Sequence, residues 1–314
     1  MSGWTRATIR QEWEDWWRGL GGLSRLGPLL GAFLFLGGHT MLGGLQGDHA
    51  LLVVGVLAGY FAGPRVRPLF LFFLPIIIVG TVYDAQRYWA DDLRAMVRVA
   101  EPHFWELNWF GISDGGLEVT PATWWQTRTH AAWDLICGAA YLLFIPVFFI
   151  TAGWWRFKER QPGAELVMWA MLWLNLAGYV AYLIYPAAPP WYVDHYGLGP
   201  AVLSAAPEAA GAARFDALLG VDWFAGYYGR NANVFGAIPS LHVGQTFLSV
   251  LFAWQFRSLR SLTTTFWLLV LFASVYLNHH YVVDGLVGMV FAVGAWSCLR
   301  VWSRRQSNPS LSYD

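Results

Sequence analysis

Histidine and aspartate residues occupy two short segments of this 314-residue sequence in patterns that suit proton transfer or nucleophilic attack. His280 and Asp284 are four residues apart, so on a helix capped by Asn278 they would lie side by side on one face. A carboxylate bonded to one imidazole nitrogen fixes the tautomer and leaves the other nitrogen free to attack or to accept a proton. The same spacing is also typical of a structural ion pair at a helix start, where an acidic residue is favoured.

The segment Pro239–His242 contains the second group of candidate residues. Ser240 is a residue type preferred at a helix N-cap, and His242 follows it in the first turn of the predicted helix. The free N–H groups of a helix start form an anion site, and a histidine beside them can protonate a leaving group. Alone, a capped helix with a neighbouring histidine is also a common structural arrangement. The catalytic interpretation therefore depends on this segment meeting His280 and Asp284.

The elements that position these residues are predicted to be membrane-spanning helices. Hydrophobic residues make up 56% of the chain and charged residues only 13%, about half the charged share of an ordinary soluble domain. Eight apolar stretches approach the roughly 20 residues that span a bilayer. They cover residues 26–45, 49–64, 68–87, 131–153, 164–185, 239–256, 262–278 and 280–301. We therefore expect an all-α fold, a polytopic membrane helical bundle with about eight transmembrane helices.

Basic residues predict the orientation of these helices, because cytoplasmic loops retain Lys and Arg. With eight spans, one side collects most of the basic residues, namely Arg6, Arg10, Arg18, Arg25, Arg65, Arg67, Arg156, Lys158, Arg160, Arg257, Arg260, Arg300, Arg304 and Arg305. Both termini are therefore expected in the cytoplasm, and both candidate segments at the external face. Because Lys158 is the only lysine, which is typical of GC-rich bacterial genomes, we expect a bacterial inner membrane protein with a periplasmic site.

The predicted organisation of the chain has five parts. These are a cytoplasmic or interfacial segment 1–25, N-terminal transmembrane helices 26–87, an external interfacial segment 88–130, a catalytic transmembrane core 131–301 and a cytoplasmic tail 302–314. The stretch 89–110 mixes charged with aromatic residues, which predicts a helix lying on the membrane surface. A formal net charge of zero provides no field that would attract nucleic acid, so no nucleic-acid partner is expected.

The two candidate segments resemble motifs of a known superfamily. Ala237–His242 (AIPSLH) and His279–Asp284 (HHYVVD) are similar to the second and third motifs of the type-2 phosphatidic acid phosphatases, relatives of soluble bacterial acid phosphatases and vanadate haloperoxidases. The similarity is greater to the branch containing fungal inositol phosphorylceramide synthase, which shares the pattern of Phe235–His242 and a preceding loop like Pro189–Tyr192 (PPWY). The resemblance covers roughly residues 131–301 and implies a phosphatidate-phosphatase-like core with extra N-terminal helices.

The resemblance implies a role for each motif residue. His280 is the expected nucleophile that forms a phosphohistidine, and Asp284 is expected to orient it and balance its charge. His242 is expected to protonate the departing oxygen and then to activate the incoming hydroxyl or water. Ser240 and its neighbouring N–H groups are expected to hold phosphate oxygens. Substrate binding is also assigned to three further motif residues: Leu241, Tyr281 and Trp191.

Two departures from the superfamily pattern concern the cations that hold phosphate. The first motif, a Lys followed by Arg-Pro, is absent, and Ser274 stands where an Arg usually precedes the nucleophile. A phosphate site still needs positive charge, preferably planar Arg donors. Arg230 in the second external loop is the first candidate, followed by Arg128 and Arg87. No metal ion and no cofactor are expected, because fixed donors and cations supply the charge stabilisation.

These observations predict an integral membrane phosphotransferase that passes a phosphate-containing headgroup, with phosphoinositol as one candidate, from a lipid donor to a lipid or alcohol acceptor. One alternative is a lipid phosphate phosphatase, in which water replaces the acceptor and a phosphomonoester or pyrophosphate is hydrolysed. Aromatic external loops that exclude water favour transfer. A second alternative is a non-enzymatic transporter or scaffold, with a proton relay or metal site built from His242, His279, His280 and Asp284.

Overall fold

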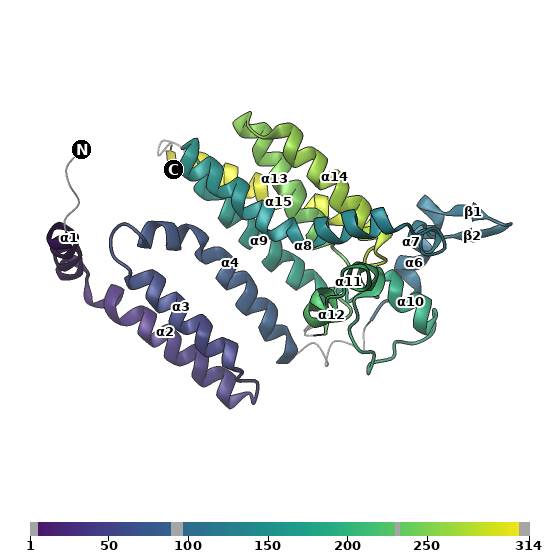
Figure 1. The fold of residues 1–314 in the computed structure, drawn as a ribbon, viewed down its shortest axis with the longest axis horizontal. Helices are drawn as coiled ribbons and strands as arrows, with labels where there is room; N and C mark the ends of the chain where they lie inside the picture. Colours follow the sequence, from purple (N-terminus) through teal and green to yellow (C-terminus); the bar gives the residue numbers. More distant parts are fainter. Residues whose placement is uncertain (1–5, 89–96, 230–232, 308–314) are drawn as a thin grey trace, which may run out of the picture. The chain divides into compact units, whose positions relative to one another are not determined.

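The computed structural model describes residues 6–88, 97–229 and 233–307 (Figure 1). Each of the eight stretches predicted to span the membrane forms a helix there. These helices are α2 (Gly22–Met41), α3 (Gly47–Phe61), α4 (Arg67–Ala85), α8 (Ala131–Gly153), α9 (Glu165–Ile184), α13 (Leu241–Phe256), α14 (Arg260–Tyr276) and α15 (Val282–Ser307). The small hairpin of β1 (Ile112–Asp114) and β2 (Leu117–Val119) is the one sheet within the described ranges. The predicted all-α fold class is confirmed.

Four of the described helices are long and apolar enough to cross a membrane by themselves. They cover Arg67–Tyr88, Ala131–Lys158, Glu165–Ile184 and Val282–Arg304. A fifth crossing would combine α1 (Arg6–Gly19) with α2, although the two helices meet at 90°. Helices α3 and α14 are apolar but shorter. The chain is an integral membrane protein, and the number of eight spans stays a prediction.

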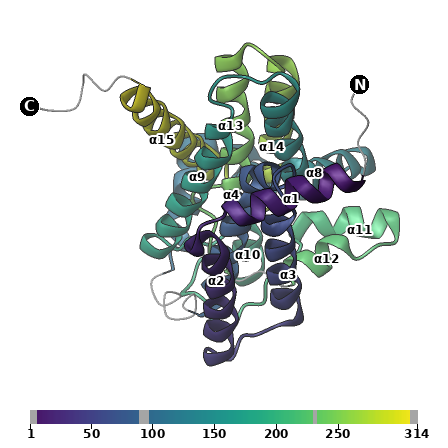
Figure 2. The same cartoon turned by 90° about the vertical axis from the view of Figure 1, so that its left-hand side faces the viewer.

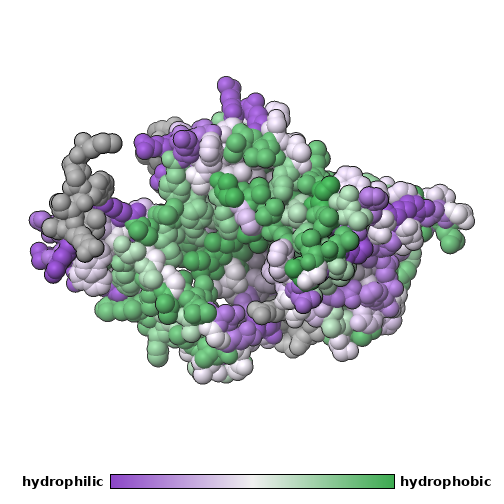
Figure 3. All heavy atoms as spheres, in the orientation of Figure 1, coloured by the Kyte–Doolittle hydropathy of each residue, from purple (hydrophilic) through white to green (hydrophobic). Residues whose placement is uncertain are grey.

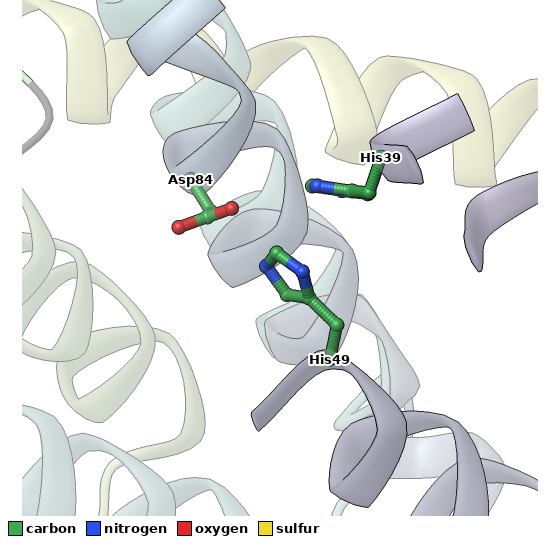
Figure 4. Close-up of side chains that lie close together, drawn as sticks. All are labelled: His39, His49 and Asp84. Atoms are coloured by element: carbon green, nitrogen blue, oxygen red, sulfur yellow. The ribbon is translucent and has the colours of Figure 1, made fainter. Parts of the chain in front are cut away.

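Residues Met1–Ile77 and Ile78–Asp314 form two compact units. In the first unit, His39 of α2 and His49 of α3 lie with their rings close together, 4.0 Å between centroids (Figure 4). His49 also closes the start of α3, because the Gln46 N–H donates to its Nδ1 over 3.1 Å in a capping box.

The second unit is built on α8, α9, α13, α14 and α15. Helices α13 and α14 run side by side in two perpendicular views (Figures 1 and 2), and α15 packs against α13 and α9. Hydrophobic residues cover the visible face of α8 and α14, whereas hydrophilic residues gather around the β1–β2 hairpin (Figure 3). Outward-facing apolar side chains such as Ile150 and Trp173 are expected where a helix meets lipid.

Short elements cover the end of this bundle at which α13 and α15 begin. They are η1 (Gln86–Tyr88), α6 (Ala100–Phe110), α7 (Pro121–Gln126), α10 (Pro190–Tyr196), η4 (Ala210–Ala212), α11 (Ala213–Leu219) and α12 (Trp223–Tyr228), while η3 (Trp154–Lys158) follows α8. The surface helix predicted over 89–110 corresponds in part to α6, and residues 89–96 lie outside the described ranges. Backbone hydrogen bonds join the loops: the Arg98 N–H donates to the Pro186 carbonyl over 2.7 Å, and the Ala187 N–H to the Phe235 carbonyl over 2.8 Å.

Glycines allow α13 and α15 to approach closely where the candidate residues lie. A Cβ atom at Gly288 would sit 2.2 Å from the Ser240 carbonyl oxygen, and one at Gly244 would sit 2.9 Å from the Gly288 carbonyl oxygen. Small residues have this function at many membrane helix interfaces. The approach lets the Ser240 N–H donate to the Asp284 carbonyl over 2.9 Å, so the two candidate segments share one backbone hydrogen bond.

The close contact of α13 and α15 gives a first testable prediction. Replacing Gly288 by Ala would force the two helices apart at Ser240, with a strain of about 1–3 kcal/mol typical of overpacking. We expect Gly288→Ala to lower the melting temperature of the purified protein and to reduce its activity at least tenfold. Gly294→Ala is the matched control on the same helix, because a Cβ there meets nothing within 4 Å. Equal behaviour of the two variants would contradict this account of the interface.

Candidate active site

The structure brings the three expected catalytic residues, called here the histidine cluster (His242, His280 and Asp284), into one chain of contacts. The Nδ1 atom of His280 lies 3.2 Å from Oδ2 of Asp284, and its Nε2 atom lies 3.3 Å from Nδ1 of His242. Asp284 is fully buried, and His280 nearly so. A carboxylate at Nδ1 holds the proton on that nitrogen, so the lone pair of Nε2 is directed at His242.

The turn between α14 and α15 aims His280, and it differs from the predicted cap. Asn278 was expected to cap the last helix, but it ends α14 in the left-handed conformation, with φ of 63°, which Asn tolerates better than most residues. The N–H groups of His279 and His280 both donate to the Ser274 carbonyl, over 3.1 and 3.0 Å. Helix α15 begins only at Val282, so His280 precedes it. His280 still pairs with Asp284, because Asp284 lies in the first turn of α15 and its side chain points back towards His280.

Ser240 is the N-cap of α13, as predicted. Its hydroxyl oxygen accepts from the Val243 N–H over 3.4 Å, and its side chain is completely buried. The first N–H groups of α13, those of Leu241 and His242, precede the hydrogen-bonded turns and are available to an anion. The Leu241 side chain points instead into α9, where a Cβ on Gly178 would meet it at 2.7 Å.

The segment Pro189–Tyr192 supports the turn between α14 and α15 through a backbone hydrogen bond. Helix α10 starts there, and the Trp191 N–H donates to the Asn278 carbonyl over 3.2 Å. One turn later, Oδ2 of Asp194 accepts from the Asn278 side-chain amide over 2.8 Å. Asn278 is therefore held at both its main chain and its side chain, which fixes the direction in which the following histidines point.

Aromatic rings enclose His242 on the side facing α8. The Tyr141 ring stacks on it with centroids 4.3 Å apart, and the Phe144 ring lies at 4.6 Å. Both aromatic residues are buried. A site lined by aromatic rings in this way leaves little room for bulk water beside the histidine.

Two residues of α6 that were not among the predicted site residues contact the segment Tyr281–Val283, where α15 begins. The carboxylate of Glu106 accepts from the N–H groups of Val282 and Val283, over 2.9 and 3.1 Å, and is fully buried. His103 lies 3.2 Å from the Tyr281 hydroxyl through its Nδ1. Burial raises the pKa of Glu106 to about 7, and the Asp284 carboxylate adds to this, whereas the two N–H groups lower it. An acidic residue inside the aromatic stretch Phe104–Phe110 is the signal that points to it.

Of the three arginines expected to hold phosphate, the two that the structure describes are both paired with carboxylates. Arg128 forms a bidentate pair with Asp114 at 2.9 and 3.0 Å and packs over Trp124. Arg87 pairs with Asp84, three residues earlier in the chain. Arg230 lies outside the described residues. Binding a phosphate through either described residue would require it to exchange a carboxylate partner for the substrate.

A fourth arginine, Arg214, contacts the end of α14, just before the turn that leads to α15. Its Nε donates to Asp134 over 2.6 Å, and its Nη2 donates to the Tyr276 carbonyl over 3.2 Å. Gln126 accepts from its third donor over 3.0 Å. These partners give Arg214 a structural role in tying α8, α11 and the end of α14 together.

Comparison with known proteins identifies the class of this site. The sequence profile of the PAP2 superfamily matches residues 113–298. The phosphoinositol dihydroceramide synthase of Bacteroides thetaiotaomicron is 34% identical over 81% of this chain and 84% of its own length. The catalytic subunit of inositol phosphorylceramide synthase from Saccharomyces cerevisiae is 29% identical over 75% of this chain and 58% of its own length. No solved structure matches the chain.

The chain therefore belongs to the PAP2 superfamily, the type-2 phosphatidic acid phosphatases, and is an enzyme. Within the superfamily it belongs to the branch of the inositol phosphorylceramide synthases, which act as lipid headgroup transferases.

The contact of Glu106 with α15 predicts a pH-dependent variant. In Glu106→Gln one N–H of α15 faces an amide donor instead of an acceptor, so the first turn that carries Asp284 is held less firmly. We expect about a tenfold loss of activity. Activity of the wild type should rise as the pH passes through about 7, where Glu106 ionises and accepts both N–H groups, and this rise should be absent from the variant. A pH–activity profile measures both effects.

The matched control is Glu101→Gln, a half-exposed glutamate of the same helix, which should keep the wild-type profile. Stability should change in the opposite direction to activity. Folding raises the pKa of Glu106 from 4.5 to about 7. The stability that this shift contributes to the free energy of unfolding is therefore fully present below pH 4.5 and is lost as the pH rises through 7. An unchanged pH profile in Glu106→Gln would remove Glu106 from this role.

Proposed function

We propose that this protein transfers a phosphate-containing headgroup from one lipid to the hydroxyl of another through a phosphohistidine on His280. The observation that supports the proposal is the continuous contact from Asp284 through His280 to His242, an order that suits an orienting carboxylate, a nucleophilic nitrogen and a proton donor. The roles follow from the order of the contacts, because the nitrogen opposite the carboxylate is the one that can attack.

In the first step, Nε2 of His280 attacks the phosphorus of the donor lipid. The N–P bond forms while the bond from phosphorus to the lipid oxygen breaks, and His242 gives its proton to that oxygen, so the lipid leaves as an alcohol. Asp284 stabilises the positive charge that develops on the imidazole. The N–H groups at the start of α13, behind Ser240, are suited to hold the phosphoryl oxygens.

In the second step, an acceptor hydroxyl attacks the phosphorus from the side of His242. The new O–P bond forms as the N–P bond breaks, and the acceptor proton passes to His242, which restores both histidines. The rings of Tyr141 and Phe144 beside His242 limit access for water. This enclosure favours transfer to an alcohol over hydrolysis.

The names of the relatives indicate the substrate class. A bacterial phosphoinositol dihydroceramide synthase and fungal inositol phosphorylceramide synthases are similar to this chain over much of its length. We infer that the donor carries phosphoinositol and that the acceptor is a ceramide-type lipid alcohol. For the missing phosphate cations, Arg230 stays the first candidate because it precedes Ser240 by ten residues. Arg128 and Arg87 follow it.

The proposed function is tested with protein reconstituted in vesicles with phosphatidylinositol labelled in its phosphate, and with ceramide. We expect a labelled sphingolipid to form, and acid-labile, base-stable phosphate to be trapped on His280 when ceramide is left out. His280→Gln should lose at least a thousandfold in activity. His195→Gln is the control, since His195 is half exposed and pairs with Glu208. Release of labelled phosphate or headgroup phosphate without a new lipid would support the phosphatase alternative instead.

We also propose that the site faces the periplasm, with both termini in the cytoplasm. The support is the distribution of basic residues, which favours the cytoplasm for the end of the bundle that carries Arg156 and Arg257. In a Cys298→Ser background, Leu117→Cys in the exposed β1–β2 hairpin should react with a membrane-impermeant maleimide in intact cells. Arg156→Cys should react only after permeabilisation. The reverse pattern would invert the proposed orientation.

A further inference from the structure

Four aromatic rings form a continuous stack that leads away from the histidine cluster. Tyr141 lies nearly parallel to His242, with centroids 4.3 Å apart and planes 14° apart, and nearly parallel to His279, at 5.4 Å and 10°. Tyr228 covers the other side of His279 at 4.5 Å and 14°. The rings come from α13, α8, the turn before α15, and α12. His279 and Tyr228 have no role in the mechanism above, in which the Tyr141 ring serves only to limit access for water.

Two polar atoms of this stack are buried and unpaired. Within the described part of the chain, neither the Tyr141 hydroxyl nor Nε2 of His279 has a hydrogen-bond partner. Only 2% of Tyr141 and 6% of His279 is exposed. Leaving a buried polar group unpaired costs about 1–3 kcal/mol, and native proteins rarely do so without a functional reason. Tyr141 stacks on His242, which contacts the expected nucleophile His280. His279 directly precedes His280 in the chain.

The chemical character of the two atoms is fixed by their surroundings. His279 makes a hydrogen bond to the backbone of Ala209, and burial lowers the pKa of its imidazole to about 3, so the ring is neutral. Because Nε2 is the unpaired nitrogen, Nδ1 is the one that donates to the Ala209 carbonyl. Nε2 is then a pure acceptor. The phenol of Tyr141 can supply a donor.

A donor and an acceptor on two adjacent, nearly parallel rings match a hydroxyl group better than the other oxygens of a phospholipid. A hydroxyl accepts one hydrogen bond and donates another, so a single hydroxyl bound between the two protein atoms would satisfy both. A phosphoryl or ester oxygen only accepts, and would leave Nε2 of His279 buried and unpaired. A site that hydrogen-bonds a hydroxyl in this way discriminates strongly against a ligand without one.

We propose that Tyr141 and His279 form a binding subsite for an alcohol hydroxyl of a substrate, beside the phosphoryl-transfer centre. The proposal rests on the proposed function, which supplies two sources of such a hydroxyl: the acceptor lipid and the polyol headgroup of the donor. The stacking of Tyr141 on His242, the expected base, puts the subsite where the acceptor hydroxyl must lose its proton.

The test separates loading of the enzyme from transfer to the acceptor. Tyr141→Phe removes one oxygen and keeps the ring stack, and Tyr196→Phe, on an exposed ring of α10, is the matched control. Reconstituted protein is given labelled phosphatidylinositol alone, to measure the rate of phosphohistidine formation, and then ceramide, to measure the rate of transfer. His279→Phe, which removes both nitrogens and keeps a flat ring, is measured in the same way. Thermal unfolding of each variant monitors the fold.

If the acceptor supplies the hydroxyl, Tyr141→Phe should reduce the rate of transfer about tenfold relative to the rate of loading, and raise the KM for ceramide. If the headgroup supplies it, loading itself should fall by that factor, and a donor whose headgroup lacks hydroxyls should be loaded equally by the variant and the wild type. Either result supports the subsite.

Rates within twofold of the wild type in both steps for Tyr141→Phe and His279→Phe would overturn the proposal, because a resident water molecule would then be the partner of these atoms. This outcome leaves the proposed function intact as long as the wild type forms a labelled sphingolipid. Failure of the wild type to transfer label to ceramide would instead refute the proposed function itself.

Discussion

The backbone hydrogen bond from the Ser240 N–H to the Asp284 carbonyl joins the two helices from which the site is built. It forms only because Gly244 and Gly288 let α13 and α15 come within backbone contact. From this contact Ser240 caps one helix and His242 extends from its first turn, while Asp284 turns back towards His280. The separation of 3.3 Å between Nε2 of His280 and Nδ1 of His242 therefore depends on the lack of a Cβ atom at Gly244 and Gly288, one helical turn further along the interface.

The turn that carries His279 and His280 is held from outside the bundle as well as from within it. The backbone of α10 bonds to Asn278, and Glu106 of α6 accepts the first two N–H groups of α15. The first N–H groups of a helix have no acceptor within the helix, so at this buried helix start Glu106 supplies the acceptors that α15 itself does not contain. Helix α6 precedes the residues matched by the superfamily profile, which start at 113. The part of the chain that precedes the matched residues thus contributes to the site through packing and capping.

Several features of the fold and site could be predicted from the sequence because they are local. Each apolar stretch forms a helix, and Ser240 is a cap, since hydrophobic length and N-cap preference operate within a few residues. The pairing of His280 with Asp284 was also predicted, although for a helix that starts earlier than it does. The left-handed conformation of Asn278 moves that start to Val282, and the contacts with α10 that hold Asn278 in place come from a segment far away in the sequence.

Residue types and spacing alone determined that this is a helical membrane protein, and they selected two histidines, an aspartate and a capped helix start as its candidate reactive groups. The chemistry of those groups is intrinsic to their side chains, so it could be inferred without coordinates. Only the tertiary structure decided that Glu106 supports α15, that Arg128 and Arg87 are paired with carboxylates, and that Tyr141 and His279 leave a donor and an acceptor unpaired beside His242. Those outcomes depend on which segments distant in the sequence pack together, and the spacing of residues along the chain does not specify that directly.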